Sequence, residues 1–125
     1  MAGCFAPNWK TGCSWVKAKG RDEWELSLAD AYLKREDYLR TAIFLQESYV
    51  TRQCIKQERD LTDYGVREAV RQEQQSANGQ FKQLCYLRNA MAHGLKLENN
   101  DTLDALQNEA RLRERLRKIR RVLFR

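Results

Sequence analysis

The sequence has few residues that interrupt helices and no long apolar run. Its 125 residues include a single proline, Pro7, so no proline breaks a helix after that position. The longest apolar runs span a few residues, whereas a membrane-crossing helix needs roughly 20. The first ten residues, MAGCFAPNWK, lack the basic region and the apolar stretch of a secretion signal. We therefore expect a cytoplasmic protein that is not inserted in a membrane.

Soft metal ligands are also scarce. Histidine occurs once, at His93, and no two of the four cysteines form a CxxC pair. Zinc sites are built from closely spaced ligands of these types, so the sequence predicts no metal site and no other cofactor. We expect the cysteines to be reduced thiols that behave as small apolar side chains. Cys54 and Cys85 fall on apolar helical faces and are predicted to lie in the core.

Positive charge is concentrated at one end of the chain. Residues 111–125, RLRERLRKIRRVLFR, hold eight Lys or Arg and one Glu, a charge of +7, so the preceding residues sum to −1 of the total of +6. The simplest interpretation is the solvated face of an amphipathic terminal helix. Binding of an RNA backbone or of a membrane surface are the alternatives, and the preference for arginine favours phosphate. The candidate RNA-binding residues are Arg117, Arg120 and Arg121.

Apolar residues recur at helical spacing, and no segment alternates with the period of a strand. This spacing predicts an all-α bundle of four or five helices in residues 21–125, after an irregular segment at 1–20 whose Trp9 and Trp15 can pack on the bundle. The predicted helices cover about 22–34, 38–54, 63–70, 81–93 and 103–123. Asp37 is predicted to cap the second helix, and Thr62 or Asp63 is predicted to start the third. A turn is predicted at 76–80, and a loop with an acidic cap at 97–101. Predicted inward-facing residues include Trp24, Leu28, Ala29, Tyr32 and Leu33 in the first helix, Leu39, Ile43 and Val50 in the second, and Leu103 and Ala110 in the last.

The stretch LRNAMAHG, residues 87–94, holds the candidate site. Gly94 is typical of a helix end and places His93 in the last turn. The negative end of the helix favours the charged imidazolium, which suits a histidine that both gives and takes a proton. Arg88 lies five residues earlier, an offset that turns the two side chains about 140° apart on an ideal helix. They meet one ligand only if the helix end distorts or if the site lies across the helix tip.

Arginine, asparagine and histidine together suit RNA cleavage. Histidine can deprotonate a 2′-hydroxyl or protonate the leaving 5′-oxygen, while arginine stabilises the charge on the phosphorane. This chemistry needs no metal and leaves a 2′,3′-cyclic phosphate. It works best with two proton-transfer groups, and a symmetric homodimer would supply the second copy of His93. The structural alternative is a histidine that only complements the helix end, with Arg88 in a surface ion pair.

The residues RNAMAH resemble the motif of HEPN ribonuclease domains, in which four to six residues, the first of them polar, separate an arginine from a histidine. The segments at 29–53, 63–69 and 81–94 look like those of the HEPN domains of CRISPR-associated type III accessory ribonucleases. The resemblance covers about residues 22–94. It implies an all-α bundle that dimerises and a composite, metal-independent site that cleaves single-stranded RNA. It also implies that Arg88 and His93 are catalytic and that Asn89 supports them.

One departure from this family concerns regulation. The accessory ribonucleases usually carry a sensor domain for cyclic oligoadenylate, and twenty irregular residues cannot encode one. The resemblance leaves open an effector domain with its sensor elsewhere, a stand-alone ribonuclease of antiviral defence, and a toxin held by an antitoxin on another chain. A non-catalytic helical module for dimerisation or RNA binding is the alternative from a different class.

Overall fold

The computed structural model describes residues 20–94 and 100–125, which form helices and no strand. The predicted all-α fold is therefore confirmed for this part of the chain. The helices are α2 (Arg21–Lys34), α3 (Tyr38–Lys56), α4 (Tyr64–Ala77), α5 (Gly79–His93), α6 (Asn100–Ala105) and α7 (Glu109–Leu123). The predictions for residues 1–19, with Trp9 and Trp15, and for 95–99 lie outside the described residues.

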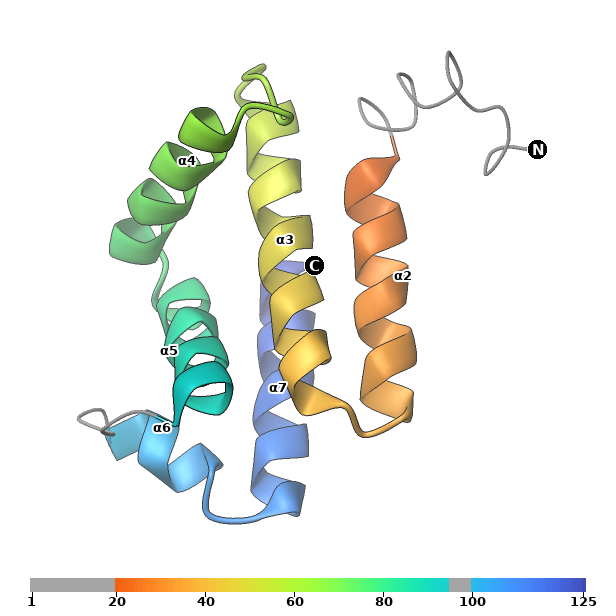
Figure 1. Ribbon diagram of the computed structural model, residues 1–125, viewed down its shortest axis with the longest axis vertical. Helices are drawn as coiled ribbons and strands as arrows, with labels where there is room; N and C mark the ends of the chain where they lie inside the picture. Colours follow the sequence, from red (N-terminus) through yellow and green to blue (C-terminus); the bar gives the residue numbers. More distant parts are fainter. Residues whose placement is uncertain (1–19, 95–99) are drawn as a thin grey trace.

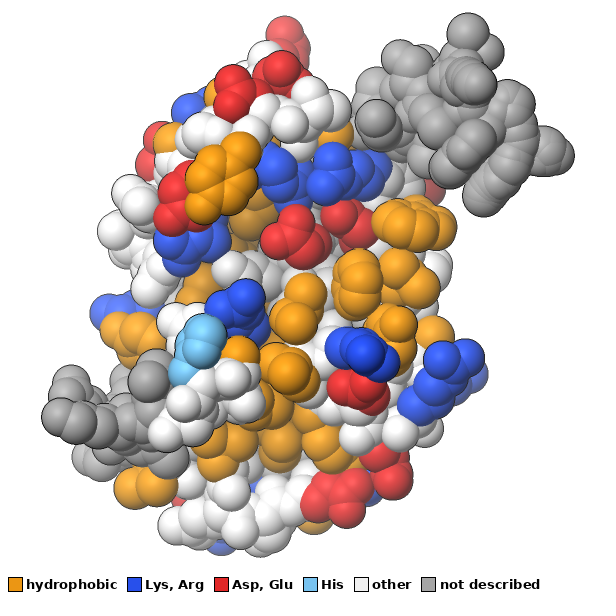
Figure 2. Space-filling view, in the orientation of Figure 1, with side chains coloured by type: hydrophobic (Ala, Val, Ile, Leu, Met, Phe, Trp, Pro, Cys, Tyr) orange, Lys and Arg blue, Asp and Glu red, His pale blue; other side chains and the backbone are white. Residues whose placement is uncertain are grey.

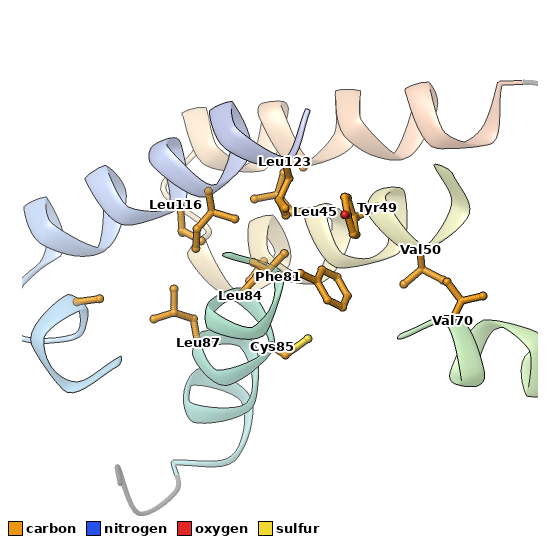
Figure 3. Close-up of a cluster of buried hydrophobic side chains, with 14 of the residues drawn as sticks. Leu45, Tyr49, Val50, Val70, Phe81, Leu84, Cys85, Leu87, Leu116 and Leu123 are labelled. Carbon is orange, nitrogen blue, oxygen red and sulfur yellow. The ribbon is translucent and has the colours of Figure 1, made fainter. Parts of the chain in front are cut away.

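Helix α3 lies at the centre of the bundle. It contacts α2 on one side and α4, α5 and α7 on the others, and α7 lies behind it in Figure 1. The core forms where α3, α5 and α7 meet, and Figure 3 shows side chains from all three pointing toward one another. The Tyr49 and Phe81 rings pack with their centroids 5.0 Å apart. The other fully buried large side chains of this core include Leu45, Leu84, Leu87, Leu116 and Ile119. Each contributes about 1.5–3 kcal/mol through burial.

The predicted aspartate caps are confirmed. The Asp37 carboxylate accepts a hydrogen bond from the Arg40 backbone N–H at 3.2 Å, and α3 begins at the next residue. Of the two residues proposed to start α4, Asp63 is the cap, because its carboxylate accepts from the Gly65 N–H at 2.9 Å. Each contact satisfies a first-turn amide that has no partner within its helix.

The last helix of the prediction is wrong in one respect, because it is two helices. Helix α6 begins at Asn100, inside the predicted loop at 97–101, and ends at Ala105. Asn108 then starts α7, since its side-chain oxygen accepts from the Arg111 N–H at 2.9 Å. The described residues thus form six helices, where four or five were predicted. The break leaves Leu103 44% exposed, and Ala110 is exposed as well, although both were predicted to face inward.

Helix α2 departs from the prediction at Trp24, whereas Ala29, which was also predicted to face inward, is buried. Trp24 is 58% exposed, while the next residue, Glu25, is 3% exposed. The carboxylate is tolerated there because Thr51 Oγ1 donates to it at 2.7 Å and Arg21 Nε at 3.2 Å. Since Ala29, one turn later, is also fully buried, the inner face of α2 runs through Glu25 and Ala29. Hydrogen bonds from Thr51 and Arg21 thus allow the Glu25 carboxylate to be buried, while the more hydrophobic Trp24 stays exposed.

The buried carboxylate predicts a pH effect on stability. Desolvation raises the pKa of Glu25 above its ordinary value, and the opposing contacts with Thr51, Arg21 and Arg67 do not cancel this effect. A raised folded-state pKa gives a stabilising contribution that is complete below the unfolded pKa and is lost as the pH rises through the folded pKa. We therefore expect Glu25→Gln to change the free energy of unfolding more favourably at pH 7 than at pH 4, measured by urea denaturation.

Glu23→Gln is the matched control, because it removes an exposed carboxylate from the same turn of α2. Its effect on stability is expected to be small at both pH values. Equal effects of the two substitutions across this pH range would contradict the role assigned to Glu25 burial.

Among the described residues, no helix combines the length and the apolar character required to cross a membrane.

Candidate functional site

Helix α5 carries Arg88, Asn89 and His93, and Asn78 anchors the start of this helix. Asn78 ends α4 and caps α5, and its side-chain oxygen accepts from the Gln80 and Phe81 N–H groups at 3.0 and 3.1 Å. Its amide also donates to the Tyr49 hydroxyl of α3 at 3.1 Å. The predicted turn at 76–80 is thus one residue long, and it ties the start of α5 to the central helix.

The other end of α5 is formed as predicted. Gly94 adopts the left-handed conformation, with φ +59°. Its N–H donates to the Ala90 carbonyl at 2.9 Å, which closes the last turn at His93. Glycine suits this position because it has no Cβ to clash in the left-handed region. The placement of His93 in the last helical residue is therefore confirmed.

His93 is exposed, whereas Arg88 and Asn89 are partly buried one turn earlier. Figure 2 shows the histidine on the surface, beside a basic side chain and at the edge of a group of apolar side chains. Arg88 Nη1 donates to Asn89 Oδ1 at 3.2 Å, so the amide holds the guanidinium. The His93 side chain makes no hydrogen bond or ion pair with any other described residue. Arg88 and His93 are thus near in sequence but are not joined by a hydrogen bond within this chain.

A buried thiol lies one turn before Arg88. Cys85 is 2% exposed, and burial raises the pKa of its thiol to about 11, although Arg71 and Arg88 oppose the shift. The thiol therefore stays neutral at cellular pH and is not an activated nucleophile. Cys54 is buried as well, and both cysteines are free, so the prediction that these two thiols lie in the core is confirmed.

The three arginines proposed to bind RNA have different surroundings. Arg120 donates to both carboxylate oxygens of Asp30 on α2, at 3.1 and 3.0 Å. Arg117 and Arg121 are exposed and form no ion pair with a described carboxylate. Arg120 therefore stabilises the contact between α7 and α2, and the other two remain available to an anion.

The predicted buried stripe of α3 is covered over only part of its length. Val50 is 3% exposed and points toward Val70 of α4 (Figure 3). Ile43 lies two turns earlier on the same side of α3, and Leu39 lies one turn before that. Both are only partly buried, because α4 covers the later half of α3. We call Leu39 and Ile43 the α3 strip.

Metal-ligating side chains do not gather in the part of the chain that the structure describes, where no three His, Cys, Asp or Glu side chains form a group suited to an ion. A comparison with protein-family models, with curated proteins and with solved structures found no match to this chain. The case for a function therefore depends on the residues of the site itself.

Proposed function

We propose that this protein is a metal-independent endoribonuclease of the HEPN type that cleaves single-stranded RNA and leaves 2′,3′-cyclic phosphate ends. The observation that carries the proposal is the arrangement at the end of α5. There an exposed histidine that no described residue engages follows a partly buried arginine–asparagine pair. The arrangement offers a proton-transfer group to solvent and a cation that is already oriented.

Each residue of the motif has a role in the proposed reaction. His93 takes the proton of the 2′-hydroxyl as that oxygen attacks the neighbouring phosphorus, or gives a proton to the departing 5′-oxygen. Arg88 stabilises the negative charge on the phosphorane, and its fork of N–H donors suits phosphate oxygens. Asn89 positions Arg88 through the 3.2 Å hydrogen bond. Single-stranded RNA is the favoured substrate, because in-line attack needs a flexible backbone.

The proposed site is complete only in a homodimer. One chain supplies one histidine, whereas the reaction uses a base and an acid. A two-fold axis near the end of α5 would bring a second Arg88 and His93 to the same RNA. The α3 strip supports a second copy of this chain as the partner. It is apolar and partly exposed.

The reaction is tested directly with the purified protein and a 5′-labelled single-stranded RNA in EDTA. We expect cleavage products whose 3′ ends resist a phosphatase that removes simple monophosphates and become sensitive after acid opens the cyclic phosphate. An RNA with a 2′-O-methyl group at the cleaved link is the matched control and should stay intact. RNA that remains uncut, or cleavage that requires an added metal ion, would contradict the proposal.

A second candidate function is a non-catalytic RNA-binding module, which the exposed arginines of α7 favour. In the EDTA experiment this function would give a shifted but intact RNA. The proposal of a HEPN ribonuclease includes a CRISPR-linked or other antiviral role. Its regulator would be a sensor domain or an antitoxin on another chain.

A further inference from the structure

Most arginines in the described part of the chain are neutralised. Nine of them form an ion pair with a described carboxylate. In α7 this holds for Arg111, Arg113 and Arg120, which pair with Asp104, with Glu36 and Glu109, and with Asp30 respectively. The excess positive charge of the C-terminal segment therefore comes from the other basic residues of α7.

Three of those residues form one exposed surface. Arg117, Lys118 and Arg121 are exposed and form no ion pair with a described carboxylate. They lie opposite the buried row of α7, Leu112, Leu116, Ile119 and Leu123. Because Arg117 and Arg121 are four residues apart, they stand about 6 Å apart along the helix axis. We call Arg117, Lys118 and Arg121 the basic face.

The basic face and the motif lie on different sides of the molecule. The buried row of α7 packs on α3 and α5, and α7 lies behind α3 in Figure 1, so the basic face is turned away from the viewer. Figure 2 has the same orientation and shows the histidine on the near side. A phosphate bound to the basic face is therefore not the phosphate of the link at which His93 of the same chain would transfer a proton.

We propose that the basic face is a separate anchoring site for the phosphates of an RNA strand, outside the link that is cleaved. Two arginines and a lysine on one helix face suit phosphate oxygens, since guanidinium groups form paired hydrogen bonds with them. A membrane surface fits less well, because the four large apolar side chains of the buried row are at most 9% exposed and cannot insert into lipid. Only the choice of RNA as the anion rests on the proposed function.

The test measures binding without cleavage. A fluorescent single-stranded RNA with 2′-O-methyl groups throughout keeps its phosphates but cannot attack itself, and its affinity is measured by anisotropy at several KCl concentrations. Each phosphate contact on a single strand contributes about 0.7 to the slope of log K against log salt. We expect Arg117→Gln/Lys118→Gln/Arg121→Gln to lower the slope by about 2 and the affinity at 0.1 M salt by up to about 100-fold.

The matched control is Lys34→Gln/Lys56→Gln/Lys82→Gln, which removes the same charge from exposed positions on α2, α3 and α5. Its slope should stay close to that of the unchanged protein. Equal losses in the two triple variants would overturn the proposal, since net charge alone would then explain binding. Binding to phosphatidylserine vesicles in place of RNA would overturn it as well. Failure of the ribonuclease proposal would appear separately, as uncut RNA in the EDTA assay. The slope is measured with an RNA that cannot be cleaved, so its value does not depend on that result.

Discussion

Replacement of His93 by alanine is expected to reduce RNA cleavage about 10²- to 10⁴-fold, the range typical for loss of a general acid or base. The His93 side chain is exposed and makes no hydrogen bond or ion pair with another described residue, so the fold does not depend on it. We expect the free energy of unfolding to change by about 0.5 kcal/mol or less, as for most surface substitutions. Cleavage rates in EDTA and urea denaturation of the same preparation give the two quantities.

The matched control for this experiment is Lys82→Ala, which removes an exposed side chain from the first half of the same helix. It should cleave RNA at the rate of the unchanged protein. Cleavage that persists unchanged in a pure, folded His93→Ala variant would refute the ribonuclease proposal. A large fall in stability would instead assign His93 to the helix end as a structural residue.

Local sequence signals predicted the helices of the described part well. Helix ends at Asp37, Asp63 and Gly94 could be predicted, because a capping carboxylate and a glycine in the left-handed region act through backbone groups only a few residues away. The same rules missed the left-handed residues that end α2 and α3. These are Glu36 and Glu58, with φ of 62° and 55°, and neither is a glycine.

Contacts between helices could not be predicted in the same way. The hydrogen bond from Arg120 to Asp30 joins residues 90 positions apart, so local spacing could not distinguish Arg120 from its exposed neighbours. Burial of Glu25 in place of Trp24 likewise depends on Thr51, which α3 supplies. In both cases the polar partner, Asp30 or Thr51, lies on another helix. Hydrophobic spacing along one helix carries no information about such a partner.

The candidate site shows the same division. Arg88, Asn89 and His93 are neighbours in sequence, and their places on α5 follow from the helix and its glycine end. The partial exposure of the α3 strip could not be predicted, because Ile43 and Val50 are both apolar and lie on the same side of the helix. Only the position of α4 makes one of them buried and the other partly exposed.

Replacement of Ile43 by aspartate is expected to convert a dimer into a monomer and to abolish cleavage. In the proposed dimer the α3 strip packs against a second copy of the chain, and a charge buried there without a partner opposes association strongly. Because the monomer has a single His93, it lacks the second proton-transfer group, and we expect at least a 10²-fold loss of activity. Size-exclusion chromatography with light scattering gives the mass, and the EDTA assay gives the rate.

Ile55→Asp is the matched control, since Ile55 lies on the same helix, is 37% exposed and is near the end of α3 where α4 follows. This variant should remain a dimer and cleave RNA normally, which separates loss of the interface from the general effect of an added charge. A folded Ile43→Asp protein that stays dimeric and active would place the interface elsewhere. A monomeric Ile43→Asp protein that still cleaves RNA at the normal rate would show that one histidine is enough, and the composite site would have to be abandoned.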